Sequence, residues 1–280
     1  MRQAVGAALF CLTLILAVVR VEAQDQALKQ IEALPWQVPP AAGNIGTVAR
    51  IQLTGDLRFL DAASSSKFIE LNGNPARNNS YVLAPRKMDW FAVFSFESTG
   101  YVQDDEKLET AELLRTLQAQ NAKGIEERKR LNLPILRLTG WAVEPHYDLG
   151  TRRLEWGTRL ANDDGSETVN YAIRILGRSG VMTVILVSEP RSLNADIQSL
   201  RGALRGFDFV PGERYAEYKP GDRAAEYGLA GLIIGGAAAA AAKSGALKGV
   251  LKIVGVAALA GLVAVGAFLR NLFKKRQNKQ

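Results

Sequence analysis

The chain has 280 residues, a formal net charge of +7 and a hydrophobic share of 48%. Its length leaves room for one or two domains with a sizeable buried core. The single cysteine, Cys11, excludes an intrachain disulfide framework and a zinc site built from several thiolates. The glycine-rich fingerprints of phosphate-loop and dinucleotide-binding proteins do not occur in the sequence.

The positive charge is concentrated at the ends of the chain. Residues 24–228 carry 25 basic and 27 acidic side chains, a net charge of −2, whereas residues 229–280 carry eight basic side chains and no acidic one. Basic flanks beside an apolar segment are typical of the cytoplasmic side of a membrane span and of contact with anionic lipid. The charge therefore indicates a membrane surface, and we expect no nucleic-acid partner.

Residues 1–23 have the pattern of a secretory signal peptide. Arg2 is a short basic region, Ala4–Val19 is apolar, and Val21-Glu22-Ala23 has the small-x-small pattern of a cleavage site. Cleavage there would leave a mature chain without cysteine. An uncleaved signal anchor is the alternative, because Arg20 lies unusually near the cut.

The next part of the chain predicts short strands and one well-defined helix. Asp89–Ser98 is the clearest strand, and its aromatic residues on both faces indicate an interior position in a sheet. Asp61 is the expected N-cap of a helix over Ala62–Leu71, which Asn72-Gly73-Asn74-Pro75 ends. The other predicted elements here are a helix over Asp25–Leu34 and strands over Ala49–Leu53, Leu57–Leu60 and Tyr81–Ala84.

A long helix and an antiparallel meander are predicted next. Leucines at helical spacing predict a helix from Leu108 to Leu131, with a kink or break at Gly124. Strand candidates with short turns between them are typical of antiparallel pairing. They cover Leu136–Val143, Arg152–Leu160, Glu167–Leu176 and Val181–Ser188, followed by a helix over Leu193–Leu204 and a strand over Phe207–Val210. The order predicts the α+β class, a mostly antiparallel sheet with packed helices, followed by C-terminal transmembrane helices.

Few residues are candidates for chemistry. His146 is the only histidine, and its neighbours Pro145 and Asp148-Leu149-Gly150 predict a turn between strands, where a surface or structural role is favoured over a general base or metal ligand. The acidic run Asp104-Asp105-Glu106 could bind a hard cation, but a solvated helix N-terminus is the commoner explanation. Four tryptophans could line a groove, although core packing is their commoner fate on strands; they are Trp36, Trp90, Trp141 and Trp156. We assign no catalytic, cofactor-binding or metal-binding residue.

Short motifs follow one another over nearly the whole mature chain. They include Leu34-Pro35-Trp36-Gln37, Arg58-Phe59-Leu60-Asp61-Ala62, Asp89-Trp90-Phe91, Gly140-Trp141, Arg153-Leu154-Glu155-Trp156 and Arg214-Tyr215-Ala216-Glu217-Tyr218. In this order they resemble the DUF2167 family of uncharacterised bacterial membrane-anchored proteins. The resemblance implies a secreted domain followed by membrane helices, and it implies no activity, cofactor or site residue.

Residues 228–270 form an apolar segment, and residues 271–280 form a basic tail. Val250–Leu269 is long enough to span a bilayer, whereas Gly228–Ala242 has only 15 residues and is marginal. A single span with a cytoplasmic tail obeys the positive-inside rule, and a two-helix hairpin with the tail outside is the alternative. Small residues four positions apart, Gly231 with Gly235 and Ala257 with Gly261, indicate close helix packing and a homo-oligomer.

The junction before this apolar segment combines tyrosines with charged residues over Gly212–Arg223. Tyr215, Tyr218 and Tyr227 suit the aromatic belt at a membrane–water interface. A polar linker is the alternative interpretation.

These features predict a periplasmic α+β domain over residues 24–227, tethered to the bacterial inner membrane with the lipid bilayer as a partner. The leading function is a non-enzymatic module that binds an envelope partner or assembles in the membrane. One alternative is an envelope hydrolase in which Glu155 works with Asp104 or Asp105, because paired carboxylates can perform acid–base catalysis. Another is a small channel or transporter accessory subunit built from the Gly/Ala-rich helices.

Overall fold

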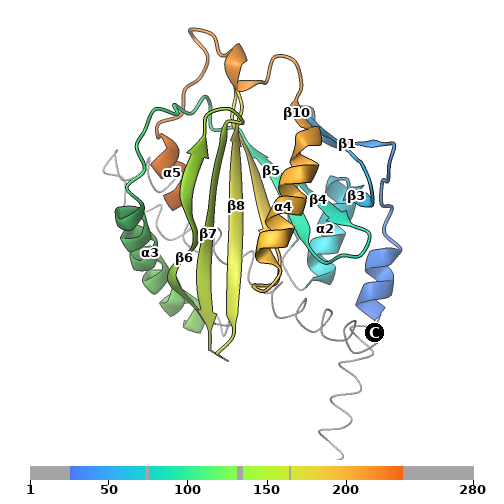
Figure 1. Ribbon diagram of the computed structural model, residues 1–280, viewed down its shortest axis with the longest axis horizontal. Coiled ribbons are helices and arrows are strands. Elements are labelled where there is room, and N and C mark those ends of the chain that lie inside the picture. Colours follow the sequence, from blue (N-terminus) through green and yellow to red (C-terminus); the bar gives the residue numbers. More distant parts are fainter. Residues whose placement is uncertain (1–25, 73–75, 131–134, 164, 236–280) are drawn as a thin grey trace, which may run out of the picture.

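The computed structural model describes residues 26–72, 76–130, 135–163 and 165–235, which form two antiparallel sheets and the helices that cover them (Figure 1). The larger sheet has seven strands in the order β3-β4-β5-β9-β8-β7-β6, and the smaller has three in the order β1-β2-β10. The predicted α+β class with a mostly antiparallel sheet is therefore confirmed.

The bounds of the elements agree closely with the predicted ranges. The strands are β1 (Ala42–Ile45), β2 (Ala49–Gln52), β3 (Leu57–Leu60), β4 (Ser80–Pro85), β5 (Phe91–Glu97), β6 (Leu136–Asp148), β7 (Arg153–Asn162), β8 (Glu167–Leu176), β9 (Val181–Val187) and β10 (Phe207–Phe209). The α-helices are α2 (Ala62–Leu71), α3 (Thr110–Arg130), α4 (Leu193–Ala203) and α5 (Leu229–Ile234), and residues 26–32 are also helical. Short 3-10 helices are η1 (Leu204–Gly206) and η2 (Tyr215–Glu217).

The two faces of the large sheet are covered by different elements, because successive side chains of a strand point to opposite sides. We call face A the side to which Glu155 of β7 points and face B the side to which Leu154 points. Face A packs against α4 and the small sheet in one core cluster. Face B packs against α2 near β3 and β4, and against α3 and α5 near β6 and β7. Figure 1 shows α4 in front of the sheet and α3 and α5 beside β6.

Two local predictions can be compared directly with the structure. Asp61 caps α2 as expected, since its Oδ1 accepts a hydrogen bond of 2.9 Å from the Ser64 N–H. Of the kink or break expected at Gly124, a break is wrong, because α3 is one helix from Thr110 to Arg130. The side-chain amide of Asn121 in α3 forms two hydrogen bonds with β6. Its Nδ2 donates to the Leu136 carbonyl at 2.9 Å, and its Oδ1 accepts from the Leu138 N–H at 2.9 Å. Such tertiary contacts offset the cost of about 1 kcal/mol for a helical glycine.

The start of the predicted membrane segment packs on the folded domain. Leu229, Leu232 and Ile233 of α5 are buried in the same cluster as face B residues of β7. The helix ends at Gly235, whose φ of 93° lies in the left-handed region that favours glycine. In the described ranges no helix has both the length and the apolar character of a membrane span. The predicted signal peptide, the span over Val250–Leu269 and the basic tail lie outside the described residues.

Candidate functional site

The polar cluster with the sole histidine is built where the edge strand β6 bulges. The register of β6 against β7 shifts between Val143 and His146, so that His146 lies directly opposite Glu155. A bulge redirects a side chain, and Pro145 is tolerated here because an edge strand needs no N–H donor on its outer side. Of the turn expected from Pro145 and Asp148-Leu149-Gly150, the part at Pro145 is wrong, because β6 continues to Asp148 and the turn follows at residues 149–152.

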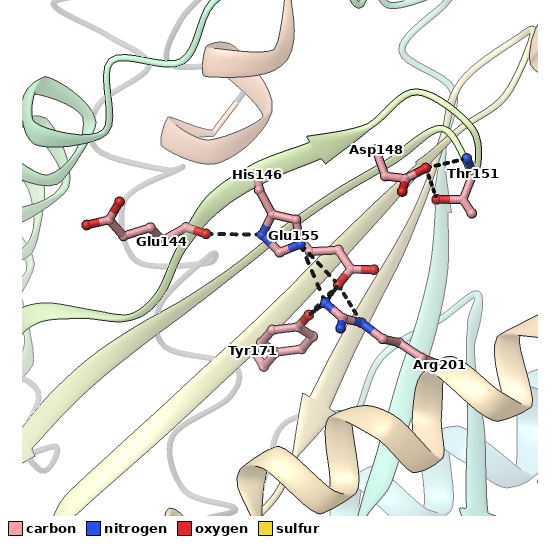
Figure 2. Close-up of polar contacts among 7 residues, drawn as sticks. All are labelled: Glu144, His146, Asp148, Thr151, Glu155, Tyr171 and Arg201. Carbon is pink, nitrogen blue, oxygen red and sulfur yellow. Dashed lines mark hydrogen bonds and ion pairs between the residues drawn. The ribbon is translucent and has the colours of Figure 1, made fainter.

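Glu155 is the buried centre of this cluster, whose polar contacts Figure 2 shows. Its side chain is 7% exposed, and its Oε2 accepts hydrogen bonds from Arg201 Nε at 3.0 Å and Nη2 at 2.5 Å. The Tyr171 hydroxyl donates to the same oxygen. A buried carboxylate needs such charged and neutral donors to offset the loss of water.

The contacts with Glu155 raise the pKa values of both Tyr171 and Arg201. Burial, together with the hydrogen bond to Glu155, raises the pKa of the Tyr171 hydroxyl well above its ordinary value. Burial alone would lower the pKa of Arg201, but its hydrogen bonds to Glu155 outweigh that effect and raise it. Tyr171 and Arg201 therefore remain protonated and act as hydrogen-bond donors to the Glu155 carboxylate.

His146 covers the cluster and is 47% exposed. Its Nδ1 lies 3.2 Å from the Glu144 carbonyl oxygen, and its Nε2 lies 3.5 Å from Arg201 Nη2 and 3.7 Å from Glu155 Oε2. A neutral ring that donates from Nδ1 turns the Nε2 lone pair toward Arg201, whereas a protonated ring turns an N–H toward Glu155. The site thus presents a held imidazole beside a guanidinium, a pair suited to contacting an acceptor group from solvent.

The second carboxylate of the hydrolase hypothesis, Asp104, lies on the other side of the sheet. It accepts a hydrogen bond of 2.8 Å from the Tyr147 hydroxyl and another from Arg152. Tyr147 follows His146 in β6 and so points to face B, opposite to Glu155. Burial would raise the pKa of Asp104, but the hydrogen bonds it accepts outweigh that effect and lower it.

The predicted acidic and aromatic groups do not gather into one site. Glu155 and Asp104 are separated by the sheet, and Asp105 is exposed. In the described part of the chain, no three His, Cys, Asp or Glu side chains are placed to hold a metal ion. The tryptophans divide among separate clusters, which agrees with the expected core packing; Trp90 lies on face A, Trp141 and Trp156 on face B, and Trp36 against α2.

The tyrosines of the junction are part of the folded domain. Tyr215 is buried, stacks on Tyr101 at 4.4 Å between ring centroids, and donates to the Val102 carbonyl at 2.9 Å. Tyr218 stacks on the same Tyr101 ring at 4.0 Å. Tyr215 is therefore a buried residue of the domain and not a side chain free to lie at a membrane interface, whereas the belt role of Tyr218 and Tyr227 stays a prediction. Ring stacking and hydrogen bonds anchor the segment that the alternative treats as a polar linker.

Sequence reasoning missed two members of the cluster, Tyr171 and Arg201. Arg201 lies 46 positions from Glu155 and Tyr171 lies 16 positions from it, on α4 and β8. The available signal was the pairing of β7 with β8 in the predicted meander, which places Tyr171 two positions from the residue opposite Glu155. No local pattern indicates where the α4 arginine docks.

These observations define an α+β protein whose seven-stranded antiparallel sheet carries a buried Glu–Tyr–Arg cluster beneath an exposed histidine. The chain belongs to the family described as "Protein of unknown function (DUF2167)", whose model matches residues 38–266. No curated protein matches it. Among solved structures, PsbP (CyanoP) from the cyanobacterium Synechocystis sp. PCC 6803 is similar at 10% identity, over 60% of this chain and 90% of that chain, with a TM-score of 0.34. A likeness at that TM-score carries no inference about this chain.

Proposed function

We propose that the chain is a membrane-tethered module of the bacterial envelope, with its α+β domain in the periplasm, that binds an envelope partner rather than catalysing a reaction. The observation that carries this proposal is the packing of α5, because the apolar C-terminal run begins inside the domain core. The signal-like residues 1–23 and the basic tail support the same arrangement.

The contacts of α5 fix the point where the chain leaves the described domain. The Glu106 carboxylate accepts a hydrogen bond of 2.9 Å from the Ala230 N–H, and Gln120 donates to the Ile234 carbonyl at 3.3 Å. A helix held at both ends in this way has a fixed position on the domain up to Gly235. That arrangement suits a module that presents one surface to a partner.

The junction before α5 is fastened to the large sheet as well. Arg178 donates to both carboxylate oxygens of Asp222, at 2.6 and 2.7 Å. Tyr101 exchanges backbone hydrogen bonds of 2.8 Å with Arg223 and Ala225. Because these contacts come from separate parts of the sheet, they favour a rigid connection over a mobile tether.

A binding role is favoured over the carboxylate hydrolase for a geometric reason. Glu155 is occupied by Tyr171 and Arg201, and Asp104 lies across the sheet. The proposed contact surface is the part of face A around His146, where polar groups are both held in place and exposed.

Membrane topology and partner binding can be tested together in living cells. A fluorescent reporter fused after Gln280 is expected to fluoresce, because the tail is cytoplasmic, while protease added to the periplasm degrades the domain. Photo-cross-linking from the β6 edge is expected to capture an envelope partner, with His146→Ala reducing capture about five-fold and Thr139→Ala on the same strand leaving it within about two-fold. Purified chain that hydrolyses an envelope substrate, with the activity lost in Glu155→Gln, would instead establish the hydrolase.

A further inference from the structure

The side chain of Arg174 lies on face B, and its guanidinium includes a buried nitrogen without a hydrogen-bond acceptor. It lies in the middle of β8, opposite Leu154 of β7 and Thr183 of β9. Its guanidinium carbon is 5.1 Å from the centroid of the Trp156 ring. The Nη1 atom is buried and has no hydrogen-bond partner.

Two other arginines of the domain, the buried Arg58 and the half-buried Arg153, have hydrogen-bond acceptors, although the Nε of each is buried without a partner. Arg58 donates to both carboxylate oxygens of Glu32 at 2.8 and 3.1 Å, and Arg153 donates to the Leu204 carbonyl at 2.8 Å. Within the described ranges, Arg174 donates no hydrogen bond and forms no ion pair. A cation–π contact offsets part of the cost of burying the charge, but it leaves the N–H donors of the planar fork unused.

The groups around Arg174 suit an anionic ligand better than an internal partner. Burial lowers the pKa of Arg174, and the negative charge of Glu97 opposes that effect without forming an ion pair with the guanidinium. Glu97 is turned to another donor, since its Oε1 accepts a hydrogen bond of 2.8 Å from the Thr183 hydroxyl. Trp156 and Ala172, which are buried in the face B cluster, make the surroundings of the guanidinium apolar.

We propose that Arg174 binds an oxyanion, a phosphate or carboxylate group, in the fork of its guanidinium on face B. The planar fork of the guanidinium matches the two oxygens of such a group. The apolar surroundings suit an anion carried on an apolar body, such as a lipid phosphate, and a free phosphate offers the same oxygens. The proposal is independent of the membrane tether.

The first experiment measures phosphate binding by the full-length chain in a neutral detergent, by calorimetric titration and by the shift in unfolding temperature. Arg174→Met keeps the length of the side chain and its packing on Trp156. It is expected to abolish the phosphate-dependent shift while leaving the unfolding temperature without phosphate equal or higher, because an unpaired buried charge is removed. Arg174→Lys keeps the charge and loses the fork, with affinity falling about ten-fold.

Two further variants separate a specific site from a general effect of charge. Arg159→Gln removes an equal charge from the exposed part of β7 and is expected to change phosphate affinity less than about two-fold. Glu97→Gln removes the opposing charge and is expected to strengthen binding about three-fold.

The source of the anion is decided by comparing inorganic phosphate with a short-chain phosphatidic acid. Tighter binding of the lipid by about ten-fold or more assigns the site to a lipid headgroup, and equal binding assigns it to a free phosphate; either result supports the site if Arg174→Met removes it. Phosphate and phosphatidic acid binding that persists in Arg174→Met overturns the proposal, as does the lack of any binding. A lower unfolding temperature of phosphate-free Arg174→Met also overturns it, because Arg174 would then be structural.

Discussion

At the scale of single residues, Glu155 and Gly100 show how side chains from distant segments fix the site and the junction. The buried charge of Glu155 is compensated by hydrogen bonds from Tyr171 of β8 and Arg201 of α4. The backbone at Gly100 can pack as it does only without a Cβ, because the Arg223 carbonyl oxygen lies too close to the position that a Cβ would take. Each dependence leads to a measurable expectation.

Replacing Glu155 by glutamine should lower the free energy of unfolding by about 2–3 kcal/mol, because Arg201 and Tyr171 lose their charged acceptor. The cost lies at the low end for a buried ion pair since the Arg201 side chain is 36% exposed and can hydrate. Urea unfolding of the detergent-solubilised chain measures it. His146→Ala is the control, expected to stay within about 0.5 kcal/mol because its contacts are long and exposed; equal effects of the two variants would contradict this account.

Replacing Gly100 by alanine should cost about 1–3 kcal/mol. The φ of Gly100 is 88°, and an added Cβ would lie 2.6 Å from the Arg223 carbonyl oxygen. The matched control is Gly124→Ala in α3, where nothing lies within 4 Å of the added Cβ. The control should gain about 0.5–1 kcal/mol from helix propensity. Thermal unfolding checks both variants, and the same sign of change in the two would refute the argument from close packing.

At the scale of elements, α5 and β6 carry most of what is particular to this fold. β6 is a long edge strand with three register shifts, which interrupt the row of unpaired backbone groups that an edge otherwise exposes. The shift nearest the end of the strand also aims His146 at Glu155. α5 joins the apolar run to the core of face B.

Truncating Leu232 to alanine should lower the free energy of unfolding of the domain by about 2–4 kcal/mol, because this α5 side chain is buried in the face B cluster. Leu149→Ala, at a turn residue that is 64% exposed, is the control and should change stability by less than about 0.5 kcal/mol. Urea unfolding followed by tryptophan fluorescence reports both. If α5 served only as the start of a membrane span, the two variants would behave alike.

At the scale of the whole molecule, two aspartates with lowered pKa values take part in the contacts that hold the C-terminal segment of the domain. Hydrogen bonds from Arg178, then from the Lys219 N–H, lower the pKa of Asp222 from 3.8 to about 2. Hydrogen bonds from Arg214 lower the pKa of Asp208 in the same direction. The pKa of Asp196 shifts in the opposite direction. Burial raises it, although the hydroxyls of Ser188 and Ser192 donate hydrogen bonds to the carboxylate.

The stability of the domain should therefore decrease as the pH falls from about 4 to about 2. A carboxylate whose pKa is lower in the folded than in the unfolded state stabilises the fold at any pH above the unfolded-state pKa. That contribution is lost as the pH falls through the folded-state pKa, which for Asp222 is about 2. Unfolding temperatures measured across this range test the slope. Asp222→Asn should flatten it, whereas Asp196→Asn should raise stability near neutral pH; an unchanged slope in Asp222→Asn would contradict the assignment.

The sequence by itself determined the local elements and the fold class. The bounds of α2 and its Asp61 cap, the β7–β8–β9 meander and the interior position of β5 follow from residue spacing and turn chemistry, which act over a few positions. The separation of charge between the domain and the ends of the chain is likewise a property of the sequence alone.

Only the tertiary structure decided which of these elements meet. β2 and β3 are close in the chain but enter different sheets, and Glu155 and Asp104 face opposite sides of the large sheet. The donors on Glu155 and the docking of α5 also come from contacts between distant residues. The physical reason is that strand register and helix docking depend on packing between segments, and a shift of one residue in a strand turns each side chain to the other face.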